Sequence, residues 1–240
     1  MAAVLLEVCV DSTEGMLAAV AGGADRIELC SALEVGGLTP SFGQMKRAAG
    51  VGVPVHALIR SRAGDFCFGP DEVATMLEDI AAAKAAGLAG VVIGASLRDG
   101  RLDEAALGRM KAAAEGMSVT LHRAFDLVPD FGEAVEVAVG LGIDRILTSG
   151  GAVGAPDGAE ALARIVGMAR GRIGILPAAG ITSGNVAALL RAVPVGEVHS
   201  ACEGYVDLDA RAVALGFGVP ERIVTDAGEV RALKAAANAG

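Results

Sequence analysis

The sequence predicts an α/β fold, a single (β/α)8 TIM barrel that occupies residues 1–240. Two observations carry this prediction: short β-rich runs alternate with Ala-rich amphipathic segments along the whole chain, and no Pro/Ser-rich linker divides it. The chain has 240 residues, close to the roughly 250 of one such barrel. Two smaller domains would need a boundary, and none is visible. With 53% hydrophobic residues there is enough apolar material for one large core.

Eight runs have the composition of strands. They span residues 5–9, 26–30, 55–60, 90–94, 118–122, 145–149, 173–177 and 197–201. Strands that alternate with helices form a parallel sheet, and eight of them close naturally into a barrel. The competing fold is an open doubly wound sheet. The lack of a GxGxxG motif after the first run weakens that alternative.

Amphipathic segments fill the intervals between the strands. Residues 71–86 form the clearest helix, because four apolar residues recur at i, i+3, i+4 and i+7, and Pro70 suits its first turn. The four are Val73, Met76, Leu77 and Ile80.

Helix starts are predicted from capping residues. Asp11 and Glu14 have the spacing of a capping box for the first helix. Thr182 or Ser183 is expected to cap the helix that runs on to residue 193, and Asp226 the last one.

The charge and the cysteines limit the class of protein. The net charge is −9, so a polyanionic nucleic acid is not an expected partner. No apolar run approaches the roughly 20 residues that span a bilayer, and the N-terminus lacks the basic start of a signal peptide. We therefore expect a cytoplasmic protein, with no membrane partner. There, its four cysteines would be free thiols, with Cys67 and Cys202 in structural positions.

The alternation within the strands is the most informative feature. Neighbouring side chains on a strand point to opposite faces, and in each run the apolar face must meet the surrounding helices. The polar face then points into the barrel, where branched apolar side chains are usual. Burial of so many ionisable groups is costly unless they are paired, so the interior is either a salt-bridge network or a functional site. The inward groups are Glu7, Glu28, His56, Arg60, His122, Glu197 and His199.

Two cysteines form the candidate metal site. Cys9 and Cys30 end adjacent strands with the same inward parity, and adjacent strands lie about 4.8 Å apart. Two thiolates at that distance suit Cu(I), which prefers soft ligands. Buried free cysteines are also common without any ligand, so packing is the alternative interpretation.

The carboxyl ends of the strands carry a second set of candidates, for an enzyme that acts on a small anionic metabolite. His122 or His199 would be the general acid or base, positioned by Glu28 or Asp126. The expected substrate-binding residues lie at these strand ends. Most belong to two loops that contain arginine and to two glycine turns that expose backbone N–H groups. They comprise Arg60, Arg62, Asp65, Arg123, Ser149, Gly150, Gly151, Gly180 and Ser200.

Two features remain open at this level. Residues 203–225 form a long connection after the eighth strand, which is either a lid over the strand ends or an irregular surface loop. Apolar helix faces would also support a homodimer, although no interface can be located.

Several motifs together resemble the CutC family, over nearly the whole chain up to about residue 200. They are Leu6-Glu7-Val8-Cys9, the segment from Gly23 to Cys30, Gly36-Gly37-Leu38-Thr39-Pro40-Ser41, Gly64-Asp65-Phe66, Leu121-His122-Arg123-Ala124-Phe125-Asp126, Leu147-Thr148-Ser149-Gly150 and Glu197-Val198-His199-Ser200.

The resemblance implies a (β/α)8 barrel, a cytoplasmic location and a role in copper homeostasis. It also implies that the family's copper ligands fall on Cys9 and Cys30. Small departures at Ser61, Ala63 and the turn Ala178-Ala179 leave the expected fold unaffected, but they weaken the expectations for loop geometry and phosphate binding. The two leading hypotheses are therefore a protein that binds Cu(I) and a barrel enzyme for an anionic metabolite, and a purely structural role is the third.

Overall fold

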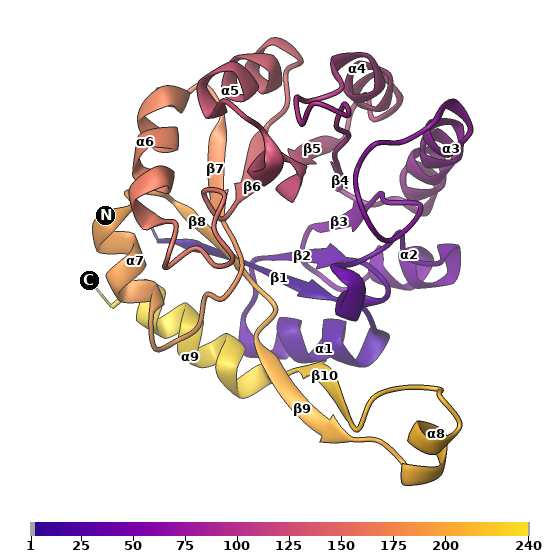
Figure 1. Ribbon diagram of the computed structural model, residues 1–240. Helices are drawn as coiled ribbons and strands as arrows, with labels where there is room; N and C mark the ends of the chain where they lie inside the picture. Colours follow the sequence, from indigo (N-terminus) through magenta and orange to yellow (C-terminus); the bar gives the residue numbers. More distant parts are fainter. Residues whose placement is uncertain (1–2, 240) are drawn as a thin grey trace.

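A computed structural model describes residues 3–239 and contains eight parallel strands with helices packed around them (Figure 1). Each predicted strand is present, with ends that move by up to two residues. The strands are β1 (Leu5–Val10), β2 (Arg26–Leu29), β3 (Val55–Leu58), β4 (Gly90–Ile93), β5 (Ser118–Leu121), β6 (Arg145–Thr148), β7 (Gly174–Pro177) and β8 (Glu197–Ser200).

The order of the strands makes the sheet a nearly closed barrel. The hydrogen-bonded order is β7-β6-β5-β4-β3-β2-β1-β8, so the first strand joins the last. β7 and β8 lie side by side, and no ladder between them is recorded among the described residues. The predicted single (β/α)8 barrel is confirmed, and the doubly wound alternative is wrong because β1 pairs with β8.

The helices form the outer layer. They are α1 (Thr13–Gly22), α2 (Phe42–Ala48), α3 (Pro70–Ala86), α4 (Glu104–Ala113), α5 (Phe131–Gly140), α6 (Ala159–Ala169), α7 (Val186–Ala192) and α9 (Ala227–Ala237), with 3-10 turns η1 (Leu33–Val35) and η2 (Arg123–Leu127). Within residues 3–239, no helix has both the length and the apolar character needed to cross a bilayer.

Capping was predicted correctly at some helices and wrongly at others. α3 begins at Pro70, as expected, and Asp226 caps α9 by accepting a hydrogen bond from the Gly228 N–H. α1 is capped by the Ser12 side chain in place of Asp11. α7 starts after Asn185, not at Thr182 or Ser183, because that stretch forms a tight turn closed by the Asn185 side chain.

Two glycines make room inside the barrel: Gly90 begins β4, and Gly94 follows directly after its end. A Cβ on Gly90 would lie 2.6 Å from the His56 ring and from the Ser118 carbonyl oxygen, and one on Gly94 would overlap the His122 ring. Glycine in a strand often marks such a close approach. β4 therefore has no inward side chain at these positions, and the histidines of β3 and β5 fill the space.

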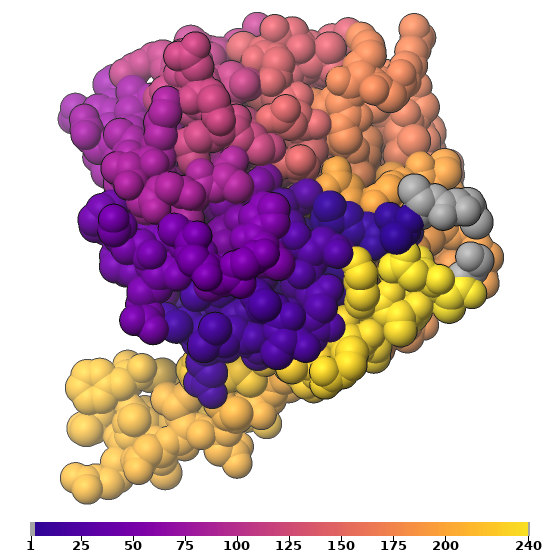
Figure 2. Space-filling model, turned by 180° about the vertical axis from the view of Figure 1, so that it is seen from behind, coloured from indigo at the N-terminus to yellow at the C-terminus, as the bar shows by residue number. Residues whose placement is uncertain are grey.

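Residues 203–225 form neither a lid nor an irregular loop. They fold into an antiparallel hairpin of β9 (Glu203–Asp207) and β10 (Glu221–Thr225) with the short helix α8 (Ala210–Ala214) between them. We call this hairpin the arm. It projects beyond the outline of the barrel in both views (Figures 1 and 2). Its base meets the barrel where β10 contacts α1.

The fit around β4 is testable with Gly90→Ala. We expect it to lower the free energy of unfolding by about 1–3 kcal/mol, because the new methyl group overlaps His56 and backbone. Gly167→Ala is the control, since a Cβ at this position, in the last turn of α6, meets no atom of another element within 4 Å. It should stabilise the protein by about 0.5–1 kcal/mol. Chemical denaturation followed by circular dichroism measures both, and equal stability of the Gly90→Ala variant and the parent would contradict the close fit.

Candidate functional site

A cavity of about 690 Å³ opens at the carboxyl ends of the strands. One wall comes from β1, β2 and β8, with Cys9, Glu28 and His199, and another from the ends of β3 and β5, with Arg60 and His122. In a (β/α)8 barrel this is the face that carries function.

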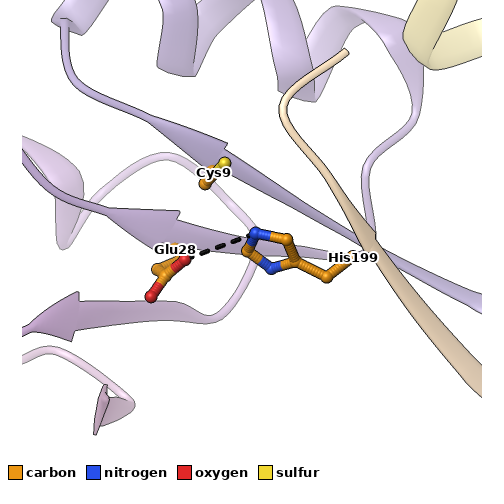
Figure 3. Close-up of side chains that lie close together, drawn as sticks. All are labelled: Cys9, Glu28 and His199. Carbon is orange, nitrogen blue, oxygen red and sulfur yellow. Dashed lines mark ion pairs between the residues drawn. The ribbon is translucent and has the colours of Figure 1, made fainter. Parts of the chain in front are cut away.

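Three potential metal ligands meet in this cavity. Cys9, Glu28 and His199 each offer one atom, and these atoms lie within 4.8 Å of one another (Figure 3). Strand register brings them together: Cys9 lies opposite Glu28 across β1 and β2, while His199 lies opposite Glu7 across β8 and β1. The three side chains therefore come from neighbouring strands with fixed positions.

A buried ionic network supports His199 from below. The His199 Nδ1–H donates to Glu7 Oε1 at 2.8 Å, and the guanidinium of Arg26 pairs with the same carboxylate through Oε2. Arg26 also donates to Glu197 at 2.6 Å, and Arg145 lies 3.5 Å from Glu197. Each inward acid thus has a partner, which is the condition for burying charge.

The network sets unusual pKa values. Burial alone would raise the pKa of Glu7, but the His199 hydrogen bond and the charges of His199 and Arg26 outweigh it and hold the pKa far below the usual range. Burial would lower the pKa of His199, but Glu7 and Glu28 raise it above its usual value. Burial raises the pKa of Glu28 to about 7, against the opposing charge of His199, whose Nε2 lies 3.5 Å away.

The two cysteines of the predicted pair have different surroundings. Burial and the charge of Glu28 raise the pKa of the Cys9 thiol well above its usual value. Burial also raises that of Cys30, whose Sγ donates to the Val10 carbonyl at 3.4 Å. Both residues line the cavity, but Cys30 is outside the three-residue cluster. It lies two residues beyond Glu28 on the same chain segment, about 6.6 Å further along.

Donor chemistry indicates what this cluster can hold. Thiolate and imidazole together suit Cu(I) and Zn²⁺, and a carboxylate adds a negative charge beside a cation. The predicted acid–base role also has a basis here, since a carboxyl group with a pKa of about 7 can exchange protons at neutral pH.

His122 and Arg60 line the cavity from the ends of β5 and β3, beyond β2 in the order of the strands. His122 is buried, its Nδ1 accepts from the Ala124 N–H, and burial lowers its pKa to about 3. Arg60 donates to the carbonyl oxygens of Val35, Gly37 and Gly64, and so ties three loop positions to the end of β3. A neutral imidazole of this kind is a poor base at neutral pH.

Several of the predicted catalytic and substrate-binding residues do not line the cavity. Arg62 points outward and pairs with Asp65 and Glu72, so it cannot join Arg60 in a clamp. Asp126 accepts from the backbone of Ser149 and Gly151 and pairs with Arg123, which makes it the anchor of the loop after β6.

The glycine turn after β6 has no free donors at these positions. The N–H groups of Ser149 and Gly151 go to Asp126, and that of Gly150 goes to the Thr148 hydroxyl. Of the other predicted residues, Arg123, Gly180 and Ser200 do line the cavity.

Two groups of residues were not predicted from the sequence: the arginines that pair with the buried acids, and the glycines that make room for the histidines. Arg26 and Arg145 complete the network, and Arg26 has the same parity as Glu28, which was a usable signal. Gly90 and Gly94 begin and end the predicted strand 90–94 and share one of its faces, a pattern that often marks close approach of a neighbouring group.

Comparisons with known proteins agree with the resemblance seen in the motifs. The model of the CutC family matches residues 4–204. A protein of Rhizobium meliloti (strain 1021) named "family protein CutC" is 56% identical over 98% of this chain and 96% of its own length. A protein of the same name from Caulobacter vibrioides (strain NA1000 / CB15N) is 49% identical over 97% of this chain and 96% of its own.

Solved structures agree with this family and with the barrel fold. The crystal structure of CutC from Streptococcus agalactiae, whose name refers to copper homeostasis, is similar with a TM-score of 0.79 and 29% identity, over 82% of this chain and 98% of that one. Thiamine phosphate pyrophosphorylase from Pyrococcus furiosus has a TM-score of 0.60 at 15% identity, over 98% of this chain and 95% of that one, which indicates a shared fold alone.

The ionic network is testable with Glu7→Gln. The variant keeps the shape but leaves Arg26 and His199 without their shared anion, so we expect the free energy of unfolding at pH 7 to fall by about 3–5 kcal/mol. Because the pKa of Glu7 is lowered in the folded state, its contribution is present above the unfolded pKa of about 4.3 and is lost as the pH falls further.

Guanidinium denaturation at several pH values measures this difference. Glu136→Gln, in the exposed pair with Arg172, is the control and should cost at most about 1 kcal/mol. A Glu7→Gln variant no less stable than this control would show that the network is not needed.

Proposed function

Because this chain belongs to the CutC family, we propose that it serves copper homeostasis by binding Cu(I) at Cys9, with His199 and Glu28 beside the ion. The observation that carries the proposal is the convergence of these three side chains at the working end of the barrel. Cys9 supplies the soft thiolate that Cu(I) prefers, and the imidazole Nε2 of His199 is a second suitable ligand.

The charge of the cavity supports a cation. Besides Glu28, the lining includes Glu203 at the base of the arm and Asp226 and Glu229 at the start of α9. These acids make that side of the entrance negative, which raises the local concentration of cations.

We further propose a cytoplasmic location. The four cysteines are free thiols, as is usual for proteins of a reducing compartment such as the cytoplasm.

The site is tested by the Cu(I) affinity of single variants, measured by competition with a chromogenic chelator under anaerobic, reducing conditions. We expect Cys9→Ser to weaken binding about 100-fold or more, and His199→Asn or Glu28→Gln about tenfold, because they remove one ligand each. The affinity of the parent should rise with pH, since the Cys9 thiol must lose a proton whose pKa is raised by burial.

Two further variants separate the alternatives. Cys67→Ser is the control, since Cys67 is only partly buried and is outside the cavity lining. A loss with Cys30→Ser as large as with Cys9→Ser would favour the Cys9–Cys30 pair over the three-residue cluster. Unchanged affinity in Cys9→Ser would rule out both sites.

A second candidate is acid–base catalysis on a small anionic metabolite. It is favoured by the pKa of Glu28, about 7, next to His199 in a cavity of about 690 Å³. A thermal-shift screen of carboxylated and phosphorylated metabolites tests it, and no stabilisation by any of them would count against it.

We also propose that the chain forms a homodimer through the arm. An isolated two-stranded hairpin is marginally stable in water, yet this one exposes Tyr205, Leu215, Phe217 and Val219, with Phe217 80% exposed. Exposed Leu17 on α1 and Phe42 on α2 offer an apolar surface to the arm of a second copy.

The double variant Leu215→Ser, Phe217→Ser should shift the mass in solution from that of two chains to that of one, because it removes the apolar tip of the arm. Size-exclusion chromatography with light scattering measures this, and circular dichroism checks the fold. Val153→Ser, at an exposed position on another loop, is the control and should stay dimeric. A parent protein that is monomeric at high concentration would contradict the proposal.

A further inference from the structure

The size of the cavity exceeds what a single ion needs. A volume of about 690 Å³ is in the range of pockets that hold small organic ligands, roughly 300–1,000 Å³. Cys9, Glu28 and His199 occupy only one wall of it. The remaining walls have a distinct arrangement of polar groups.

Two buried donors at the ends of β3 and β5 have no partner among the described residues. They are Arg60 Nε and His122 Nε2, and both side chains are more than nine-tenths buried and line the cavity. Since His122 Nδ1 accepts from Ala124, the proton of the neutral ring is on Nε2. Both side chains pack against Phe66: the centroid of its ring lies 4.7 Å from that of the His122 ring and 5.0 Å from Arg60 Cζ.

Unpartnered buried donors cost free energy until an acceptor reaches them. One donor here is cationic and the other neutral, so a carboxylate matches them. Arg123, half-exposed at the cavity wall, adds a second positive charge on the same side.

The side nearest the arm has the opposite charge. Glu203, Asp226 and Glu229 line it, and the first accepts a hydrogen bond from the Tyr205 hydroxyl. The cavity is therefore positive toward β3 and β5 and negative toward the arm. A ligand with a carboxylate at one end and an ammonium group at the other matches this polarity.

The cluster itself lacks a second soft ligand. Cys9 is its only thiol, and Cys30 is held by the Val10 carbonyl outside the cluster. Cu(I) prefers thiolates, so a thiol that enters with the ion would bind it better than the Glu28 carboxylate does.

We propose, on the premise that Cys9 binds Cu(I), that the cavity takes up the ion together with a small zwitterionic thiol of the amino acid or short-peptide class. The thiolate of this molecule completes the coordination of copper with Cys9, and its carboxylate binds Arg60 and His122. In the exchange, Cys9 displaces one of two thiolates from a soluble Cu(I) complex. The proton lost by Cys9 goes to the leaving thiol, so neither oxidation nor reduction is involved.

The test uses the full chain loaded with one Cu(I) under anaerobic conditions. Isothermal titration with glutathione, S-methylglutathione and 2-mercaptoethanol separates the contributions of the thiol and the charged groups. We expect glutathione to bind at least about tenfold more tightly than 2-mercaptoethanol, which lacks the carboxylate, and S-methylglutathione to leave copper coordination unchanged. X-ray absorption at the copper edge should count one sulfur ligand before glutathione is added and two after.

A conservative variant locates the carboxylate. His122→Asn keeps an acceptor for the Ala124 N–H but loses the Nε2–H donor. It should reduce the ratio of glutathione to 2-mercaptoethanol affinity about tenfold. Arg62→Gln, in the same loop region as Arg60 but outside the cavity lining, should leave this ratio unchanged.

The outcomes separate the two proposals. Cys9-dependent copper binding with a sulfur count that stays at one, or with equal affinity for glutathione and 2-mercaptoethanol, overturns the zwitterionic thiol and leaves the copper site standing. This ligand series on the parent protein decides the matter even if a variant does not fold. Copper binding that is independent of Cys9 removes the premise.

Discussion

The ion pair between Glu7 and Arg26, with His199 as the third member, is the interaction on which the rest of the interior depends. The strand register places these groups opposite one another across β8, β1 and β2. Charges in this position are tolerated only when each has a partner, so the network fixes the side chains that belong to it. His199 is consequently held with its second nitrogen toward Glu28 and Cys9, and the metal cluster follows from that orientation.

A second constraint is space. Small residues on β4 leave room for His56 and His122, which come from the strands on either side. Loop contacts then fix the entrance: Arg60 holds three carbonyl groups, and Asp126 holds the turn after β6. These ionisable residues therefore serve the shape of the cavity. Charged residues at a strand end are as useful for fixing loops as for chemistry, since each bond to a backbone group removes a degree of freedom.

The two functional hypotheses draw on the same groups. The raised pKa of Cys9 keeps its thiol protonated near neutral pH, and the pKa of Glu28, about 7, keeps its carboxyl group protonated in part of the molecules, until a cation or a substrate arrives. A bound cation favours loss of those protons, whereas an acid–base catalyst would pass them to a substrate. The cluster of thiol, carboxylate and imidazole favours the first, because general acid–base chemistry has no need for a buried thiol.

From the sequence by itself, the eight strands, their inward faces and the barrel could be derived, because the period of two in a strand assigns each side chain to a face regardless of its neighbours. The same rule placed Cys9, Glu28 and His199 inside. Only the tertiary structure decided which inward groups meet, since that depends on the register between strands: Cys9 faces Glu28, and Cys30 lies one layer beyond. It also decided the hairpin form of residues 203–225 and the outward position of Arg62, because loop conformation depends on contacts that no local pattern encodes.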